Sequence, residues 1–328
     1  MKRAVIGVIG NPNCGKTTLF NQLTGSKQKV GNWPGVTVDR KEGIISLRGE
    51  THLLVDLPGT YALDSHDDEL SVDEKIAREF ALSGEAQLII NILDASNLHR
   101  NLFLTSQLLD MGIPVICAVN MIDVAEREGI HVDCQRLAEE LGVHVVPIVA
   151  STGVGIPELC RVLGHQLGHA TVATPMIRPD KDLDGAVHQL KEALQGTVPN
   201  AFWTATRVLE QDIYAMKDLP QDRREQIEAQ AAVLRRQLEN THEQPIDVLV
   251  ANGRYRAIER ILQQVLTINS LGRSLSERID DWVLNRWLGI PFFFFIIGRN
   301  TALDKRKTEL KLVSMISSHS ASFIRISK

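Results

Sequence analysis

One short stretch limits what this chain can fold into: residues 10–17 have the sequence Gly-Asn-Pro-Asn-Cys-Gly-Lys-Thr. This pattern fits G-x-x-x-x-G-K-[ST], a loop whose backbone N–H groups bind the phosphates of a nucleotide. The apolar run over residues 4–9 predicts a buried strand before the loop, and residues 16–24 predict a helix after it. In that setting we expect Lys16 to reach the β and γ phosphates and Thr17 to bind Mg²⁺. The alternative, a chance match in a glycine-rich turn, is disfavoured by the flanking strand and helix.

Strand and helix patterns alternate over residues 1 to about 170, which predicts an α/β fold with a mostly parallel sheet and helices on both faces. The expected strands are residues 4–9, 43–48, 52–56, 87–93, 114–119 and 144–149, and the expected helices are 16–24, 71–83, 99–111, 133–141 and 156–168. Further along the chain, four helical patterns predict a small all-α bundle over 183–194, 202–216, 222–239 and 246–266. Ligands of such sheets bind at the carboxyl ends of the strands.

Two stretches after the first helix contain residues that could bind Mg²⁺ and the γ-phosphate. Residues 30–37, Val-Gly-Asn-Trp-Pro-Gly-Val-Thr, are rich in Gly and Pro and predict a mobile loop. We expect Thr37 to close on Mg²⁺ and the γ-phosphate and to release them after hydrolysis; the alternative is that Thr37 only begins a strand. The apolar run over 52–56 ends at Asp56, which is expected to reach Mg²⁺ through water, while the Gly59 N–H meets the γ-phosphate.

The strand predicted over residues 114–119 leads into Asn-Met-Ile-Asp at 120–123. An acidic side chain there can accept hydrogen bonds from N1–H and N2–H₂ of guanine, whereas adenine has no donors at those positions. Such a site rejects the wrong base because a buried carboxylate would be left unpaired. We expect Asn120 to brace the loop, and the backbone of residues 150–152 to contact the base oxygen. A plain turn is the alternative for residues 120–123.

These motifs define one predicted site. The predicted nucleotide-binding residues are Gly10, Asn11, Pro12, Asn13, Cys14, Gly15, Lys16, Thr17, Thr18, Gly35, Val36, Thr37, Asp56, Leu57, Pro58, Gly59, Asn120, Met121, Asp123, Ala150, Ser151 and Thr152. The candidates for catalysis are Lys16, Thr37, Gly59 and Asn13. The candidate Mg²⁺ ligands are Thr17, Thr37 and Asp56.

The order and spacing of the motifs resemble the GTP-binding domain of translation-factor-like GTPases. Residues 10–18, 30–38, 56–61 and 94–98 resemble more narrowly the bacterial ferrous iron transport protein B (FeoB) family, specifically its cytosolic N-terminal portion. The resemblance covers nearly all of residues 1–290, and Gly-Asn-Trp-Pro-Gly-Val-Thr is its most specific part. It implies a P-loop GTPase that regulates ferrous iron transport across the inner membrane.

The resemblance also implies how the chain is divided. A GTP-binding domain is expected over 1–170, a helical regulatory domain over 171–270, and the start of a first membrane-helix region over 271–298. Only 12 uncharged residues separate Arg286 from Arg299, whereas a membrane-spanning helix needs about 20. Residues 299–328 carry seven Lys or Arg against two Asp or Glu. We therefore expect a truncated or frame-shifted reading whose basic tail is foreign to the fold; a buried or interfacial helix end is the alternative.

The expected hydrolysis is slow. Thr60 stands where fast GTPases carry a water-orienting Gln, and no motif places an internal Arg finger. We expect turnover on the order of 10⁻³ to 10⁻² s⁻¹ without a partner. The resemblance implies that Asn13 helps to hold K⁺ beside the phosphates, where a cation offsets charge developing in the transition state. The alternative is that Asn13 is a turn-former bonding within its own loop.

Charge and cysteine usage limit the partners. A net charge of −4 and four scattered cysteines argue against a nucleic-acid partner, a C-x-x-C metal site and a disulfide framework. His165 and His169 have a spacing that can hold metal, with solvated surface histidines as the alternative. The resemblance implies the membrane domain of a full-length transporter, small Feo accessory proteins and a homo-oligomer as partners, at the cytoplasmic face of the bacterial inner membrane. A GTP-dependent assembly factor and a non-catalytic nucleotide-gated module remain alternatives.

Overall fold

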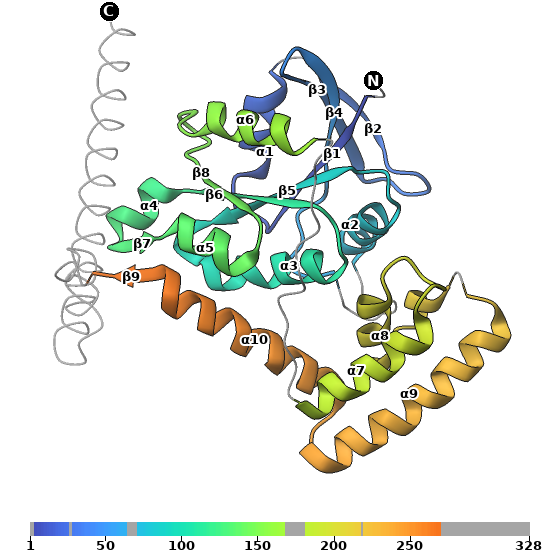
Figure 1. The fold of residues 1–328 in the computed structure, drawn as a ribbon. Coiled ribbons are helices and arrows are strands. Elements are labelled where there is room, and N and C mark those ends of the chain that lie inside the picture. The colour runs from blue at the N-terminus through green and yellow to red at the C-terminus, as the bar shows by residue number, and fades with distance from the viewer. Residues whose placement is uncertain (1–2, 26–27, 64–70, 168–180, 218, 270–328) are drawn as a thin grey trace, which may run out of the picture. The chain divides into compact units, whose positions relative to one another are not determined.

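The protein's architecture comes from a computed structural model (Figure 1), which describes residues 3–25, 28–63, 71–167, 181–217 and 219–269. All of these described residues belong to one unit, residues 1–269. The predicted membrane-helix start over 271–298 and the basic tail over 299–328 therefore lie outside the described residues. Within the described ranges, no helix combines the length and the apolarity needed to cross a membrane.

The core of the fold is a sheet of seven strands in the order β2-β3-β4-β1-β5-β6-β8. The strands are β1 (Val5–Gly10), β2 (Gln28–Asn32), β3 (Asp39–Leu47), β4 (Glu50–Asp56), β5 (Leu88–Asp94), β6 (Val115–Asn120) and β8 (His144–Pro147). From β4 to β8 every neighbouring pair is parallel, whereas β2–β3 and β3–β4 are antiparallel. The predicted α/β fold with a mostly parallel sheet is confirmed, and the carboxyl ends of β1, β4 and β6 meet at one edge.

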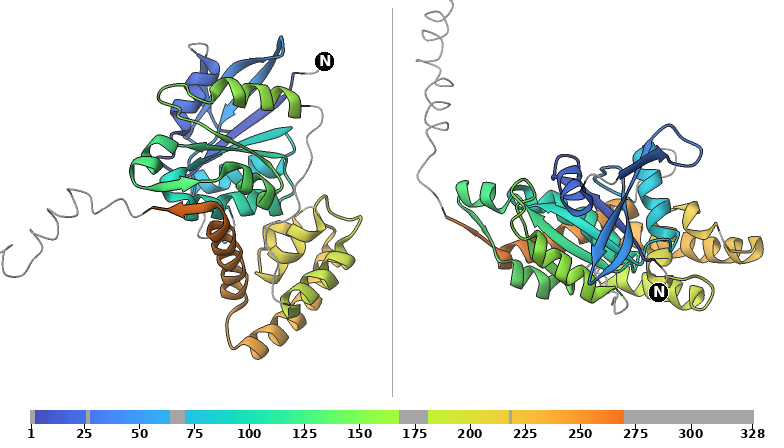
Figure 2. Two further views of the ribbon diagram at one scale, coloured as in Figure 1. Left: turned by 60° about the vertical axis from the view of Figure 1, so that its left-hand side comes forward. Right: turned by 90° about the horizontal axis from the view of Figure 1, so that it is seen from above.

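Helices cover both faces of this sheet (Figures 1 and 2). One face carries α1 (Lys16–Thr24) and α6 (Ile156–Gln166), and the other carries α2 (Val72–Leu82), α3 (Leu98–Asp110) and α5 (Cys134–Leu141). The central strands are therefore buried on both faces, which is why β1 and β5 are nearly continuous apolar runs rather than alternating ones. Helix α2 begins with a capping box between Ser71 and Glu74.

The second half of the described chain is an all-α bundle, as predicted. It comprises α7 (Lys181–Leu194), α8 (Ala201–Leu209), α9 (Gln221–His242) and α10 (Ile246–Val265), which bury their own apolar core. The helix predicted over 202–216 is wrong in its second half. Helix α8 ends at Leu209, Gln211 adopts a left-handed backbone (φ 64°), and a short 3₁₀ helix, η2 (Ile213–Met216), follows. A second 3₁₀ helix, η1 (Ala95–Asn97), precedes α3.

Buried charges connect the bundle to the sheet domain. Arg78 on α2 forms an ion pair with Asp212 at 3.0 Å, and Arg207 approaches the same carboxylate at 3.1 Å. Arg254 on α10 binds Asp110 on α3 at 2.9 Å. These side chains are at most 5% exposed. Removing one partner of such a pair leaves an uncompensated buried charge, which typically costs about 3–5 kcal/mol.

Four further short elements, β2, α4, β7 and β9, were not predicted from the sequence. Residues 30–32 of the predicted loop belong to β2, so only residues 33–38 lie between β2 and β3. All five residues of β2 are exposed, and without a buried face the segment shows no alternation; its conformation depends on pairing with β3. Helix α4 (Ile122–Arg127) leads to β7 (Ile130–Val132), which pairs with β9 (Leu266–Ile268) in a separate two-stranded sheet.

Candidate nucleotide-binding site

The loop between β1 and α1 has the backbone shape of a phosphate cradle. Asn13 and Gly15 both adopt left-handed conformations, with φ of 68° and 92°. A Cβ on Gly15 would lie 2.3 Å from Nδ2 of Asn120, so only glycine fits there. Gly15 is the N-cap of α1 and supplies no side-chain cap. The first N–H groups of α1 are thus available to an anion at the positive end of the helix dipole.

Lys16 and the predicted Mg²⁺ ligands line one cavity of about 410 Å³, whereas Asn13 and Gly59 do not line it. Its lining includes Lys16, Thr17, Thr37 and Asp56, which come from α1, the loop after β2 and the end of β4. The Lys16 ammonium and the Asp56 carboxylate form an ion pair at 2.5 Å, with side chains only 13% and 7% exposed. The hydroxyl and carboxylate oxygens gathered here are the hard donors that Mg²⁺ prefers.

The segment after β4 returns to the phosphate loop. The Leu57 N–H donates to the Val8 carbonyl, and the Thr60 N–H donates to the Gly10 carbonyl at 3.2 Å. Gly59 lies against Pro12, since a Cβ on Gly59 would be 3.5 Å from Pro12 Cα. The Thr60 side chain is buried, and its hydroxyl donates to the Ala62 carbonyl at 2.7 Å. This hydroxyl is therefore engaged with the backbone and is not directed at the cavity.

Asn120 connects the two loops that would enclose a base. Its Nδ2 donates to the Cys14 carbonyl at 2.8 Å, and its Oδ1 accepts from the Ala150 N–H at 2.9 Å. The side chain is 3% exposed, so both hydrogen bonds are shielded from water. The next residue, Met121, takes a left-handed conformation (φ 61°) and ends the strand as the N-cap of α4.

Asp123 lies in the first turn of α4 with a half-exposed carboxylate. Arg127, one turn later on the same helix, approaches it at 3.3 Å. Ala150 is buried, whereas Ser151 and Thr152 are exposed. The Thr152 and Gly153 N–H groups donate to the Val149 carbonyl and close a tight turn after β8.

Cys14 and Asn13 have contrasting environments within the same loop. Cys14 is 1% exposed, and burial raises the pKa of its thiol to about 11. The reactive thiolate is therefore scarce at neutral pH, which argues against a role in redox sensing. Asn13 is exposed beside it, so its side chain is accessible to a ligand from solvent.

Sequence reasoning missed two aromatic contacts that border the site. Trp33, in the loop that carries Thr37, is buried against Phe80 of α2. Tyr61, just after Thr60, lies under the Arg100 guanidinium at 3.8 Å from the ring centroid. The sequence contained a hint of the first contact, because a tryptophan in a loop of Gly, Asn and Pro is an apolar residue without an obvious face to bury.

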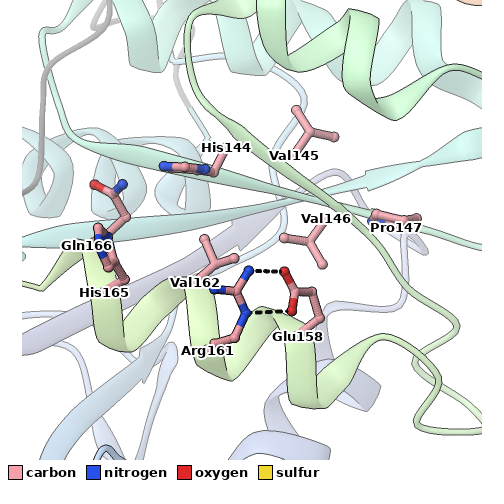
Figure 3. A pocket seen from close by; sticks show the side chains of 9 residues that line it. All are labelled: His144, Val145, Val146, Pro147, Glu158, Arg161, Val162, His165 and Gln166. Atoms are coloured by element: carbon pink, nitrogen blue, oxygen red, sulfur yellow. Dashed lines mark hydrogen bonds and ion pairs between the residues drawn. The ribbon is translucent and has the colours of Figure 1, made fainter.

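A second cavity, of about 340 Å³, lies apart from these residues between β8 and α6 (Figure 3). Glu158 and Arg161 pair across one turn of α6 beside it, and His144 and His165 both line it. His169, the predicted companion of His165, lies outside the described residues. Among those that are described, no cluster of three or more His, Cys, Asp or Glu side chains could hold a metal ion.

Known proteins resemble this chain in both halves. The family model described as "Ferrous iron transport protein B" matches residues 4–163, and the model described as "FeoB cytosolic helical domain" matches residues 180–267. The chain belongs to the FeoB family. The predicted resemblance is thereby confirmed, together with the P-loop GTPase fold followed by a helical domain.

Individual FeoB relatives agree with this assignment. The chain is 40% identical over 300 residues to the Fe(2+) transporter FeoB of Escherichia coli (strain K12), a match that covers 90% of this chain and 38% of the relative. The chain thus spans about two fifths of the length of the curated relatives it matches. Two solved structures cover 80% of this chain and all of their own: a mutant S. thermophilus NFeoB bound to GDP (38% identical, TM-score 0.72) and the cytosolic domain of L. pneumophila FeoB (37%, 0.68).

Proposed function

We propose that this chain is the GTP-binding and slowly GTP-hydrolysing cytosolic portion of a ferrous iron uptake transporter. The observation that carries the proposal is the pair of hydrogen bonds through which Asn120 joins Cys14 of the phosphate loop to Ala150. That bracing makes a base-binding end and a phosphate-binding end parts of one site. Family membership and the GDP bound to the S. thermophilus relative support a guanine nucleotide as ligand.

In the proposed site, Asp123 accepts hydrogen bonds from guanine, and the backbone of residues 150–152 contacts the base oxygen. The backbone N–H groups of the phosphate loop and the Lys16 ammonium bind the phosphates. Thr17, Thr37 and Asp56 would hold Mg²⁺, which neutralises charge on the phosphate oxygens when bound. Lys16 and Asp56 pair with each other in the structure, and phosphate and metal compete for the two members of that pair.

Hydrolysis in this site is proposed to be slow because the water-orienting position is held by Thr60, whose hydroxyl is bonded to a backbone carbonyl. We further propose that Asn13 helps to hold K⁺ beside the phosphates. Phosphate release measured in KCl and in NaCl tests this: faster turnover in K⁺ is expected, and equal rates would contradict it. An Asn13→Ala variant should lose the difference between the two salts.

The domains and partners follow from the family. We propose a GTP-binding domain over 1–170 and a helical regulatory domain over 171–270, supported by family matches that end at residues 163 and 267. Residues 271–298 would begin the first membrane-helix region, and residues 299–328 are proposed to be a tail foreign to the fold. The partners are then the membrane domain of the full-length transporter at the cytoplasmic face of the inner membrane, small Feo accessory proteins and a second copy of the chain.

Calorimetry on the purified chain with Mg²⁺ tests the central claim. GDP is expected to bind and ADP to give no heat, while Lys16→Ala should abolish the GDP signal. Equal heats for GDP and ADP would refute a guanine-specific site. Single-turnover phosphate release from GTP then separates a GTPase from a nucleotide-gated module that binds GTP without cleaving it.

A further inference from the structure

Trp33 is buried in a place where the neighbouring sequence predicts exposure. It is 6% exposed, although Asn32 and Pro34 on either side of it are exposed. Its ring meets Phe80 of α2 edge to face, with centroids 5.6 Å apart and an interplanar angle of 78°. This is the preferred arrangement of two aromatic quadrupoles. The loop between β2 and β3 thus places its largest apolar side chain on a helix that is remote in sequence.

Arg40 covers the same contact from β3. Its guanidinium lies 4.5 Å from the Trp33 ring centroid and 5.9 Å from that of Phe80. Glu85 and Glu42 hold the guanidinium at 2.7 and 2.8 Å. Burial alone would lower the pKa of Arg40, but the two carboxylates raise it above its ordinary value, so the cation persists at any physiological pH.

The contact of Trp33 with Phe80 and Arg40 holds the start of the loop, residues 33–38, that carries Thr37. The Trp33 N–H donates to the Val38 carbonyl at 2.9 Å, and the Val36 N–H donates to the Trp33 carbonyl at 3.3 Å. These bonds close residues 33–38 into one turn, and Thr37 within that turn lines the cavity of Lys16 and Asp56. The position of Thr37 is therefore tied to the position of Trp33.

One feature disfavours the docked state, in which the Trp33 ring packs against Phe80 and Arg40. The Trp33 Nε1–H is buried and has no hydrogen-bond partner among the described residues. A buried donor without an acceptor disfavours the state that contains it. A residue that only filled the core would not need this group, since Phe would stack on Phe80 as well. Docking of Trp33 thus combines favourable stacking with an unfavourable buried N–H, which is the balance expected of a reversible contact.

We propose that Trp33 is the positioning residue for Thr37, and that its docking between Phe80 and Arg40 holds the loop where Thr37 can engage the Mg²⁺–triphosphate. This inference rests on the proposed function. Only a nucleotide with a γ-phosphate uses Thr37, so the apparent affinity for that nucleotide falls with the docked fraction of the loop. GDP has no γ-phosphate and does not use Thr37, so its affinity should change little when Trp33 is not docked.

The test compares affinities of the full chain for a non-hydrolysable GTP analogue and for GDP, both with Mg²⁺. Trp33→Ala should weaken analogue binding about tenfold and GDP binding less than about twofold. Trp33→Phe, which retains the ring contact and removes the buried N–H, should bind the analogue at least as tightly relative to GDP as the unaltered chain does. Leu234→Ala is the control, because Leu234 on α9 is likewise buried, at 8%, but in the separate core of the helical bundle; it should lower stability without changing the ratio.

An unchanged ratio in Trp33→Ala, or an equal change in Leu234→Ala, would overturn the inference. If Trp33→Ala does not fold, Arg40→Gln takes its place, because it retains Trp33 but removes the cation over the ring. The affinity for the analogue should then fall about threefold. An unchanged affinity would count against the inference. Failure of the unaltered chain to bind GDP would instead refute the proposed function, so the two failures are distinguishable.

Discussion

The two ends of the candidate site are held in different ways. At the base end, Asn120 links two loops by buried hydrogen bonds to Cys14 and Ala150. At the γ-phosphate end, the loop that carries Thr37 is held by an edge-to-face aromatic contact, a cation over the ring and two hydrogen bonds within the turn. Breaking the Asn120 hydrogen bonds would leave buried polar groups unpaired. The loop that carries Thr37 can instead move away from α2 as a whole, because its two hydrogen bonds lie within the turn. In the proposed site, a fixed base-binding end would thus be combined with a loop that can release the third phosphate.

The base-end carboxylate should show the largest effect. Asp123→Asn is expected to weaken GDP and the GTP analogue alike, by about 10³-fold or more, because a site built to hydrogen-bond one partner strongly rejects a mismatched one. Preference should move toward xanthine nucleotides. Calorimetry with GDP and XDP measures both effects. Unchanged GDP affinity would show that Asp123 does not read the base.

The bracing side chain comes next. Asn120→Ala should weaken both nucleotides by about 10- to 100-fold, because it leaves the Ala150 N–H buried without an acceptor, a cost of about 1–3 kcal/mol. The melting temperature should fall as well. An effect confined to the triphosphate analogue would contradict the rigid base end, since both nucleotides share the guanine.

A change at the γ-phosphate end should discriminate between nucleotides. Thr37→Ala is expected to weaken the GTP analogue about tenfold in Mg²⁺ while leaving GDP nearly unchanged, because it removes a proposed Mg²⁺ ligand that only the triphosphate state would use. Thr241→Ala, at an exposed threonine near the end of α9, is a matched control expected to leave that ratio unchanged. Equal weakening of both nucleotides would erase the contrast between the two ends.

The smallest effect is expected at the Cys14 thiol, which is buried within the phosphate loop. The raised pKa of Cys14 and its burial predict slow labelling by iodoacetamide at pH 8, with Cys160, which is only half-buried, labelled sooner. Because the folded-state pKa is raised, thiolate forms only as the pH approaches 11. Mass spectrometry locates the label. Fast labelling of Cys14 in the folded chain would show that the phosphate loop opens, contrary to a rigid base end.

The sequence predicted the parts of the fold that have a buried pattern of their own. β1, β5 and β6 are apolar runs, and α1, α3 and α10 show helical periodicity. The pattern of apolar residues along the chain was therefore sufficient to predict these elements. β2 has no buried residue and forms only by pairing with β3. The end of α8 depends on one left-handed residue, Gln211, whose conformation a propensity does not reveal.

The site divides in the same manner. Residues in one motif, such as Lys16 and Thr17, and residues at adjacent strand ends, such as Asp56, could be placed together because parallel strands end at one edge. The docking of Trp33 could not be foreseen, because Phe80 is remote in sequence and lies on a different element. A contact between a loop and a helix is set by packing, and no local pattern encodes it.

The short ladder between β7 and β9 has a mechanical consequence. Helix α4, which begins next to Asp123, leads to β7, and β9 is bonded to β7 immediately before the described chain ends. Two flanking bonds, from the Asp133 N–H to the Val265 carbonyl and from the Asn269 N–H to the Gly129 carbonyl, extend the connection. Residue 269 is itself bonded to the end of this ladder, so no unpaired residue lies between them. A displacement of the chain at that point is therefore passed through these hydrogen bonds to Gly129, two residues after the end of α4.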